Sequence, residues 1–366
     1  VVVNMGRQSN SGRSLLRLGV ISFYYAMLAS TIHAQTPSPD VVTIFNNKTK
    51  KMQTYRGTIV SYDYDELKLQ LVSGREQLVP SSQISNISSK WNADYIAAEG
   101  YMFERRFERA SISFRQAYSK EARQWVKHRI TAKIIQCEQN MGDWHKAANQ
   151  FFDVLLSQQS NTPYLTAAPI VWHPLTSSGE LLHRGRELMK AENPLKQLVG
   201  ASWLFSSPYN DEALILFKQL EQHSDRSIAL LAAAQLWRSK TPLAKPEDVT
   251  YWDQAVTELP KELRAGPLYI VSLMKRRLDM EEEAVLTMMR IPILYPSQHH
   301  LASEAVHAAV KELMDMAQYD EALNLCKELA ANYSDTTAGT QAKRLESSIH
   351  SRIKARNAIK QEGDSS

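Results

Sequence analysis

Residues 92–122 read NADYIAAEGYMFERRFERASISFRQAYSKEA, and their hydrophobic pattern decides the fold class. Apolar residues recur at the three- and four-residue spacings of an amphipathic helix. They form two stripes, one comprising Ala93, Ile96, Ala97 and Tyr101 and the other Phe107, Ala110, Phe114 and Ala117. Because small residues in both stripes let two backbones approach closely, the stretch predicts a pair of short helices folded into a hairpin.

The order of small and aromatic residues in this hairpin is similar to that of the tetratricopeptide repeat, whose period is about 34 residues. The matching residues are Ala97, Ala98, Tyr101, Phe107, Ala110, Phe114 and Ala117. Arg105 replaces the turn glycine of that family, and Ala122 replaces its closing proline. The resemblance implies a superhelix of stacked hairpins whose concave surface binds proteins or peptides.

Helical periodicity of the same kind continues towards the end of the chain. We expect repeat-like hairpins over residues 92–158 and a proline-containing segment with a helix over 159–193. Degenerate and then repeat-like hairpins should fill 194–360, where a capping helix ends the array. The predicted fold is therefore mainly α: a superhelix of about five α-hairpins, preceded by a small all-β barrel.

Residues 38–90 have a hydrophobic period of two, which predicts short strands over 41–45, 55–62, 67–72, 76–79 and 84–87. A sheet of such short strands must close or pack on a neighbour, and the segment resembles SH3-like or Sm-like barrels. A docking module and a peptide- or nucleic-acid-binding module both fit this pattern. The hydrophobic period changes from two to that of a helix before Asn92. We therefore expect the barrel and the helical part to be separable, with Trp91 packing one against the other.

Residues 1–34 predict a secretory signal peptide, because Arg13 and Arg17 precede an apolar run that ends in a small-residue cleavage site at Ala34. An uncleaved anchor is the alternative; no later stretch is apolar enough to span a membrane. We expect export to the periplasm or cell envelope in a bacterium, and secretion otherwise. The net charge of +4 includes the three arginines of this segment, so nucleic-acid binding is not expected.

Few residues have the type and spacing expected of a catalytic or metal-binding site. Glu281, Glu282 and Glu283 open a predicted helix, where the helix dipole explains three acids better than acid–base catalysis does. His300, Glu304 and His307 have a spacing that suits metal ligands, but no second motif completes a metal site, so a solvated first helical turn explains them better. We therefore expect no catalytic residue, no metal site and no cofactor. Cys137 and Cys326, the only cysteines, should be buried thiols.

The segment 157–179 interrupts the helices with Pro163, Pro169 and Pro174. It either lines a groove and presents Trp172 and His173 to a ligand, or packs as a belt along neighbouring helices. We favour the belt because Ile170, Val171 and Trp172 are too apolar to remain in water.

The family resemblance places the partner on the first helix of each hairpin. Setting the repeats in register puts nine residues on that surface, namely Arg129, Gln136, Gln139, Asn140, Tyr269, Arg276, Arg277, His307 and Lys311. Their hydrogen-bonding and basic side chains suit an acidic peptide or a C-terminal carboxylate. An ordinary solvated face is the alternative.

These patterns together predict a non-enzymatic exported scaffold that binds protein or peptide partners, within a cell-envelope assembly in a bacterium. The alternative is a hydrolase-like enzyme of α-hairpin architecture with an unrecognised site. A cleft that holds two carboxylates within about 10 Å of each other would favour that alternative.

Overall fold

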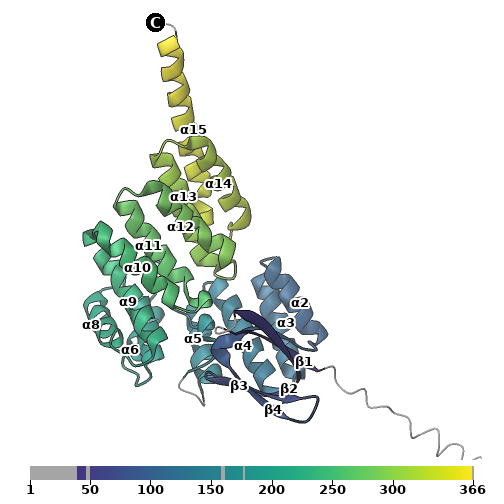
Figure 1. Cartoon of the computed structure of the whole chain (residues 1–366). Helices are drawn as coiled ribbons and strands as arrows, with labels where there is room; N and C mark the ends of the chain where they lie inside the picture. The colour runs from purple at the N-terminus through teal and green to yellow at the C-terminus, as the bar shows by residue number, and fades with distance from the viewer. Residues whose placement is uncertain (1–38, 47–49, 158–160, 176–177, 365–366) are drawn as a thin grey trace, which may run out of the picture.

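A computed structural model describes residues 39–46, 50–157, 161–175 and 178–364 (Figure 1). This part of the chain is mainly helical, with 14 α-helices and one five-stranded antiparallel sheet on the N-terminal side. The predicted signal peptide, residues 1–34, lies outside the described residues. None of the described helices is both long enough and apolar enough to cross a membrane.

The sheet forms where the period of two predicted strands. It comprises β1 (Asp40–Asn46), β2 (Lys51–Tyr62), β3 (Glu66–Leu71), β4 (Glu76–Pro80) and β5 (Ile84–Ser88), in the order β4-β3-β2-β1-β5. Alternate residues such as Val42, Ile59 and Leu69 are buried on one face. Gly57 in β2 allows a close approach to β3, because a β-carbon there would lie 2.1 Å from the Gln70 carbonyl oxygen.

The helices follow in an almost continuous series. They are α2 (Ala93–Phe103), α3 (Phe107–Lys120), α4 (Gln124–Asn140), α5 (Trp144–Gln150) with a π-helical turn (Phe151–Leu155), α6 (Gly179–Met189), α7 (Pro194–Leu204), α8 (Asn210–Leu220), α9 (Arg226–Lys240), α10 (Pro246–Glu258), α11 (Ala265–Arg277), α12 (Glu281–Leu294), α13 (His299–Asp315), α14 (Tyr319–Asn332) and α15 (Thr337–Asp364). Most helices pack on their neighbours in the chain. Alternate helices also touch along the series α7, α9, α11, α13 and α15.

Four of the helix pairs are closed by the same kind of turn. A residue in the left-handed conformation lies between α2 and α3, α4 and α5, α11 and α12, and α13 and α14: Arg105, Gly142, Asp279 and Ala317, respectively. In each turn the next backbone N–H donates to a carbonyl five residues earlier, as from Arg106 to Tyr101 and from Gln318 to Leu313, both at 2.8 Å. This Schellman geometry satisfies carbonyls that the helix end would leave unpaired.

The sheet and the first helices share one core. Val42, Ile59 and Leu67 from the strands belong to the same buried cluster as Phe114 and Ile130 from α3 and α4, while the later helices bury a second cluster. Trp91 lies at this junction and stacks on Tyr95 with 4.6 Å between ring centroids. The expected boundary before Asn92 is therefore a change of secondary structure, and not a gap between separate cores.

The interpretation of the proline-rich segment as a belt is confirmed for its described residues, 161–175, which we call the belt. Leu165, Ala167, Val171 and Trp172 are buried in the cluster formed by the later helices. Trp172 packs directly on Gly266 of α11, where a β-carbon would lie 2.0 Å from its ring.

The last hairpin, α13 and α14, contacts α3 of the first hairpin and α4 of the second, so the helical series closes on itself. Asn140 at the end of α4 donates to the Ser297 carbonyl and accepts from the His299 backbone N–H at 3.3 Å. Phe107 of α3 also packs edge-on against the His299 ring. The C-terminal part of α15 projects away from this closed body (Figure 1).

Candidate functional site

The four candidate residues on α4 lie along one side of that helix but have different surroundings. Arg129 is half-buried, and its Nε donates to the Tyr95 hydroxyl at 3.1 Å. Gln136 is half-buried, and its Oε1 has no hydrogen-bond partner among the described residues. Gln139 and Asn140 are buried. The structure therefore leaves Arg129 and Gln136 as the more accessible of the four.

Gln139 already holds an extended segment of the same chain. Its Nε2 donates to the Ala167 carbonyl of the belt at 2.7 Å. Further along the belt, Gln235 of α9 donates to the Val171 carbonyl at 2.9 Å, and the Ser202 hydroxyl of α7 accepts from the Val171 N–H at 3.0 Å. The polar side chains of α4, α7 and α9 thus bind backbone groups of the belt, an extended segment of the same chain.

The candidate residues on α11 and α13 gather on one face. Tyr269 and Arg276 of α11 and Glu304, His307 and Lys311 of α13 influence one another electrostatically, and we call these five residues the α11–α13 polar face. Arg277 lies apart from them: its guanidinium donates to the Ala244 carbonyl at 3.2 Å. Glu304 was considered from the sequence only as a possible metal ligand.

Burial sets the charge states on this face. It raises the pKa of the Tyr269 phenol and of the Glu304 carboxyl. Burial, together with the charges of Lys311 and Arg276, lowers the pKa of His307 to about 4. His307 is therefore neutral at pH 7, and its buried Nε2 has no hydrogen-bond partner among the described residues. Arg276 is engaged by Glu312, with 2.5 Å between Nε and Oε2, whereas Lys311 is exposed. The face therefore offers the exposed Lys311 to a ligand.

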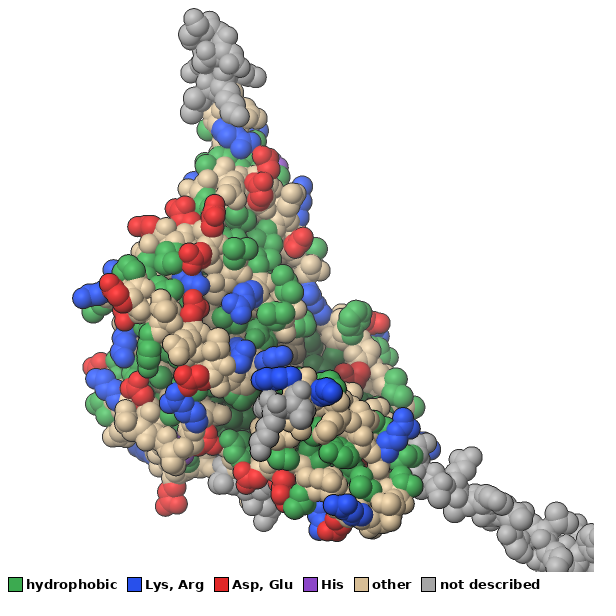
Figure 2. Space-filling model, viewed as in Figure 1, with side chains coloured by type: hydrophobic (Ala, Val, Ile, Leu, Met, Phe, Trp, Pro, Cys, Tyr) green, Lys and Arg blue, Asp and Glu red, His purple; other side chains and the backbone are tan. Residues whose placement is uncertain are grey.

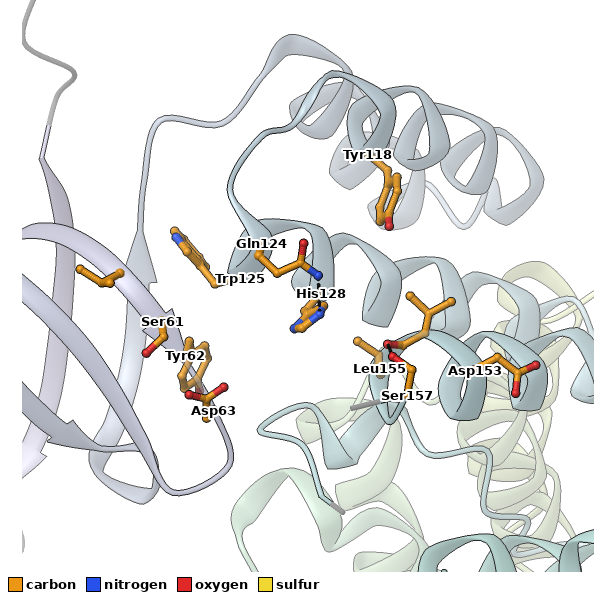
Figure 3. A pocket seen from close by; sticks show the side chains of 12 residues that line it. Ser61, Tyr62, Asp63, Tyr118, Gln124, Trp125, His128, Asp153, Leu155 and Ser157 are labelled. Atoms are coloured by element: carbon orange, nitrogen blue, oxygen red, sulfur yellow. Dashed lines mark hydrogen bonds between the residues drawn. The ribbon is translucent and has the colours of Figure 1, made fainter. Parts of the chain in front are cut away.

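A separate cleft of about 480 Å³ lies between the sheet and the helices (Figure 3). Ser61 and Tyr62 of β2 form one wall, Gln124 and His128 of α4 the base, and the π-helical turn at Leu155 the other wall. A π-helical turn is uncommon and often accompanies a functional site. Sequence reasoning missed this cleft because its walls come together only through the packing of β2 on α4 and of α4 on the π-helical turn.

The cleft is built from neutral polar and aromatic groups. Burial raises the pKa of Tyr62 to about 12 and lowers the pKa of His128, so both are uncharged at pH 7. The Gln124 amide donates to Nε2 of the neutral His128 ring at 2.8 Å, which leaves Nδ1–H as a donor. The two carboxylates that line the cleft, Asp63 and Asp153, come from opposite walls (Figure 3). This chemistry suits recognition of backbone or amide groups.

Within the described ranges, no group of three His, Cys, Asp or Glu side chains could hold a metal ion. Cys137 and Cys326 are buried free thiols, and burial raises the pKa of Cys137 to about 12. Basic and acidic side chains are interspersed on the face seen in Figure 2.

No protein-family model matches this chain, and no curated protein is significantly similar to it in sequence.

Proposed function

We propose that this protein is a non-enzymatic exported scaffold that binds a protein or peptide partner through a tetratricopeptide-like superhelix. Two observations favour this architecture: the turn shared by the four repeat-like hairpins, and the contacts between alternate helices. The strand order, in which β5 returns to pair with β1, supports an SH3-like or Sm-like barrel beside them. In a bacterium the scaffold would belong to a cell-envelope assembly.

The gathering of four predicted residues on the α11–α13 polar face is the observation that carries the proposal. From the sequence, only the register of two repeats predicted that four residues would lie together: Tyr269, Arg276, His307 and Lys311. Each of them now lies within electrostatic range of at least one other. Lys311 is exposed and makes no ion pair with a described residue, so it is available to an acidic peptide or a terminal carboxylate. The belt, held by side chains of α4, α7 and α9, is an example within the chain of such recognition.

The experiment is affinity capture from the envelope fraction with Lys311→Glu. We expect the variant to lose the captured partner, because a carboxylate at this position repels an acidic ligand. Lys327→Glu makes the same charge change on the exposed surface of α14 and is the matched control. Arg276→Glu is less suitable because it would leave the buried Glu312 beside another acid. Equal capture by Lys311→Glu, Lys327→Glu and the unaltered protein would refute the proposal for this face.

Export depends on the predicted signal peptide. If cleavage follows Ala34, mass spectrometry of the exported protein should give Gln35 as its first residue. A mature chain that keeps residues 18–29 would instead indicate a membrane anchor.

A further inference from the structure

The two edges of the sheet differ in how they are protected. Natural sheets guard exposed edges with charges, prolines or covering segments, because unpaired backbone groups attract another strand. The β4 edge has such guards: Glu76 and Pro80 lie at its ends, and the Gln77 side chain donates to the Leu78 carbonyl. The β5 edge, Ile84–Ser88, reads ISNIS and contains neither a charge nor a proline. In the described part of the chain it pairs with β1 on one side only.

A groove of about 380 Å³ follows this unguarded edge. Three consecutive residues of β5, Asn86, Ile87 and Ser88, line it. Because side chains alternate between the two faces of a strand, a groove that touches all three runs along the strand edge and not over one face. Trp91 and Ile96 form the opposite wall, and Ile96 is 60% exposed although it is apolar. We call this space the β5 groove.

The β5 groove carries one net positive charge, because Arg129 and Lys133 line it together with the single acid Glu99. The Arg129 Nε donates to the Tyr95 hydroxyl, and its guanidinium carbon lies 5.0 Å from the centre of the Trp91 ring. No carboxylate lies within ion-pair distance of Arg129 in the part of the chain that the structure describes. The other two charges in the groove, Lys133 and Glu99, pair with each other at 3.0 Å. The fork of N–H donors on a guanidinium suits a carboxylate.

We propose that the β5 groove binds an extended peptide, which adds as a strand to β5 and places a carboxylate on Arg129. Main-chain hydrogen bonds to β5 would supply affinity, while Arg129 and the apolar surface of Trp91 and Ile96 select the side chains. The carboxylate belongs either to an acidic side chain or to the C-terminus of the peptide. This surface lies between β5 and helices α2 and α4. Arg129 is one of the nine residues predicted to face a partner, but the groove is distinct from the α11–α13 polar face, so it goes beyond the proposed function.

The test uses a displayed library of random heptapeptides with free C-termini, selected on the full chain. Each selected peptide is then synthesised as a free acid and as a C-terminal amide, and its affinity is measured. We expect Arg129→Met to weaken binding about tenfold or more, the effect of one charge-assisted contact. Ile96→Ser should weaken it several-fold, while Ile112→Ser, a matched change at a 52% exposed position on α3, should leave it unchanged. Weaker binding of the amide assigns the carboxylate to the C-terminus, and equal binding assigns it to a side chain.

Hydrogen exchange locates the bound peptide. Backbone amides of residues 84–88 should exchange more slowly when the peptide is present, and Lys311→Glu should not alter this protection. The proposal fails if no peptide is selected, or if Arg129→Met and Ile96→Ser bind as well as the unaltered protein. It also fails if protection appears on α11 and α13, or if residues 84–88 become protected by raising the protein concentration without peptide. The last result would assign the edge to self-association.

Discussion

Gly266 determines where the belt can lie, because the Trp172 ring occupies the space that any larger residue would need. A β-carbon on Gly266 would lie 2.0 Å from the ring, far inside normal contact distance. Gly266 is the second residue of α11, so the Trp172 ring packs directly against the first turn of that helix.

Gly266→Ala should lower the free energy of unfolding by about 1–3 kcal/mol, because overpacking displaces Trp172 from α11. Thermal denaturation, followed by tryptophan fluorescence, measures both the stability and the environment of the ring. Gly100→Ala on α2 is the matched control, since a β-carbon there meets nothing within 4 Å. That control should be neutral or slightly stabilising. If the two variants melt alike, the packing of the belt against α11 is not as described.

At the scale of elements, prolines obscured helix α10 in the sequence but correctly marked the belt as an interruption of the α-helices. Helix α10 lies within the range 194–360 that was expected to hold hairpins, but the sequence did not single it out, because Pro242, Pro246 and Pro260 surround a short apolar stripe. Pro246 occupies the first position of that helix, where its missing N–H costs nothing. Trp252 of α10 stacks on Trp237 of α9 at 4.9 Å between ring centroids, which anchors the helix. A proline at the start of an apolar stripe was the signal that could have identified it.

The belt shows how an element without regular hydrogen bonds is held in place. Its buried backbone groups must find partners, and side chains of the surrounding helices supply them. The Trp203 indole donates to the Pro169 carbonyl at 2.8 Å, in addition to the bonds from Gln139, Ser202 and Gln235. Gln139 was predicted to bind a partner peptide; it binds a peptide segment, but one from its own chain. The apolar residues of the belt predicted that it would be buried. Which side chains form hydrogen bonds with its backbone depends on the packing of the helices around it.

At the scale of the whole molecule, four histidines lie where distant elements meet. His173 of the belt stacks on His300 of α13, with 6.5 Å between ring centroids. His299 contacts Phe107, and His307 lies on the α11–α13 polar face. Burial lowers the pKa of all four, to about 4 for His173 and His307. An unfolded histidine titrates near pH 6.5, so the unfolded state binds more protons between pH 6.5 and 4. The histidines therefore stabilise the fold above pH 6.5 and lose this contribution as the pH falls towards 4.

The effect of one histidine can be isolated by comparing His173→Gln with the unaltered protein in urea denaturation at several pH values. The stability of the unaltered protein relative to the variant should fall by up to about 3 kcal/mol between pH 7 and pH 4. The comparison between the two proteins is needed because burial also raises the pKa of Glu138 to about 6. Glu138 therefore makes the fold less stable as the pH rises, which is opposite to the effect of the histidines. His350→Gln, on the exposed surface of α15, is the matched control. A difference between the two proteins that does not vary with pH would contradict the prediction.

The sequence by itself determined the local elements, because hydrophobic period and turn chemistry depend on residues a few positions apart. It placed all five strands and the helix pair on either side of Arg105. It also placed Tyr269, His307 and Lys311 on a common face, but it did not find the cleft beside His128 or the groove along β5. Only the tertiary structure decided those sites, the core shared by the sheet and α2–α4, and the closure of the helical series. The physical reason is that such features depend on which surfaces meet: Asn140 and His299, which join α4 to α13, are 159 positions apart, and no periodicity connects them.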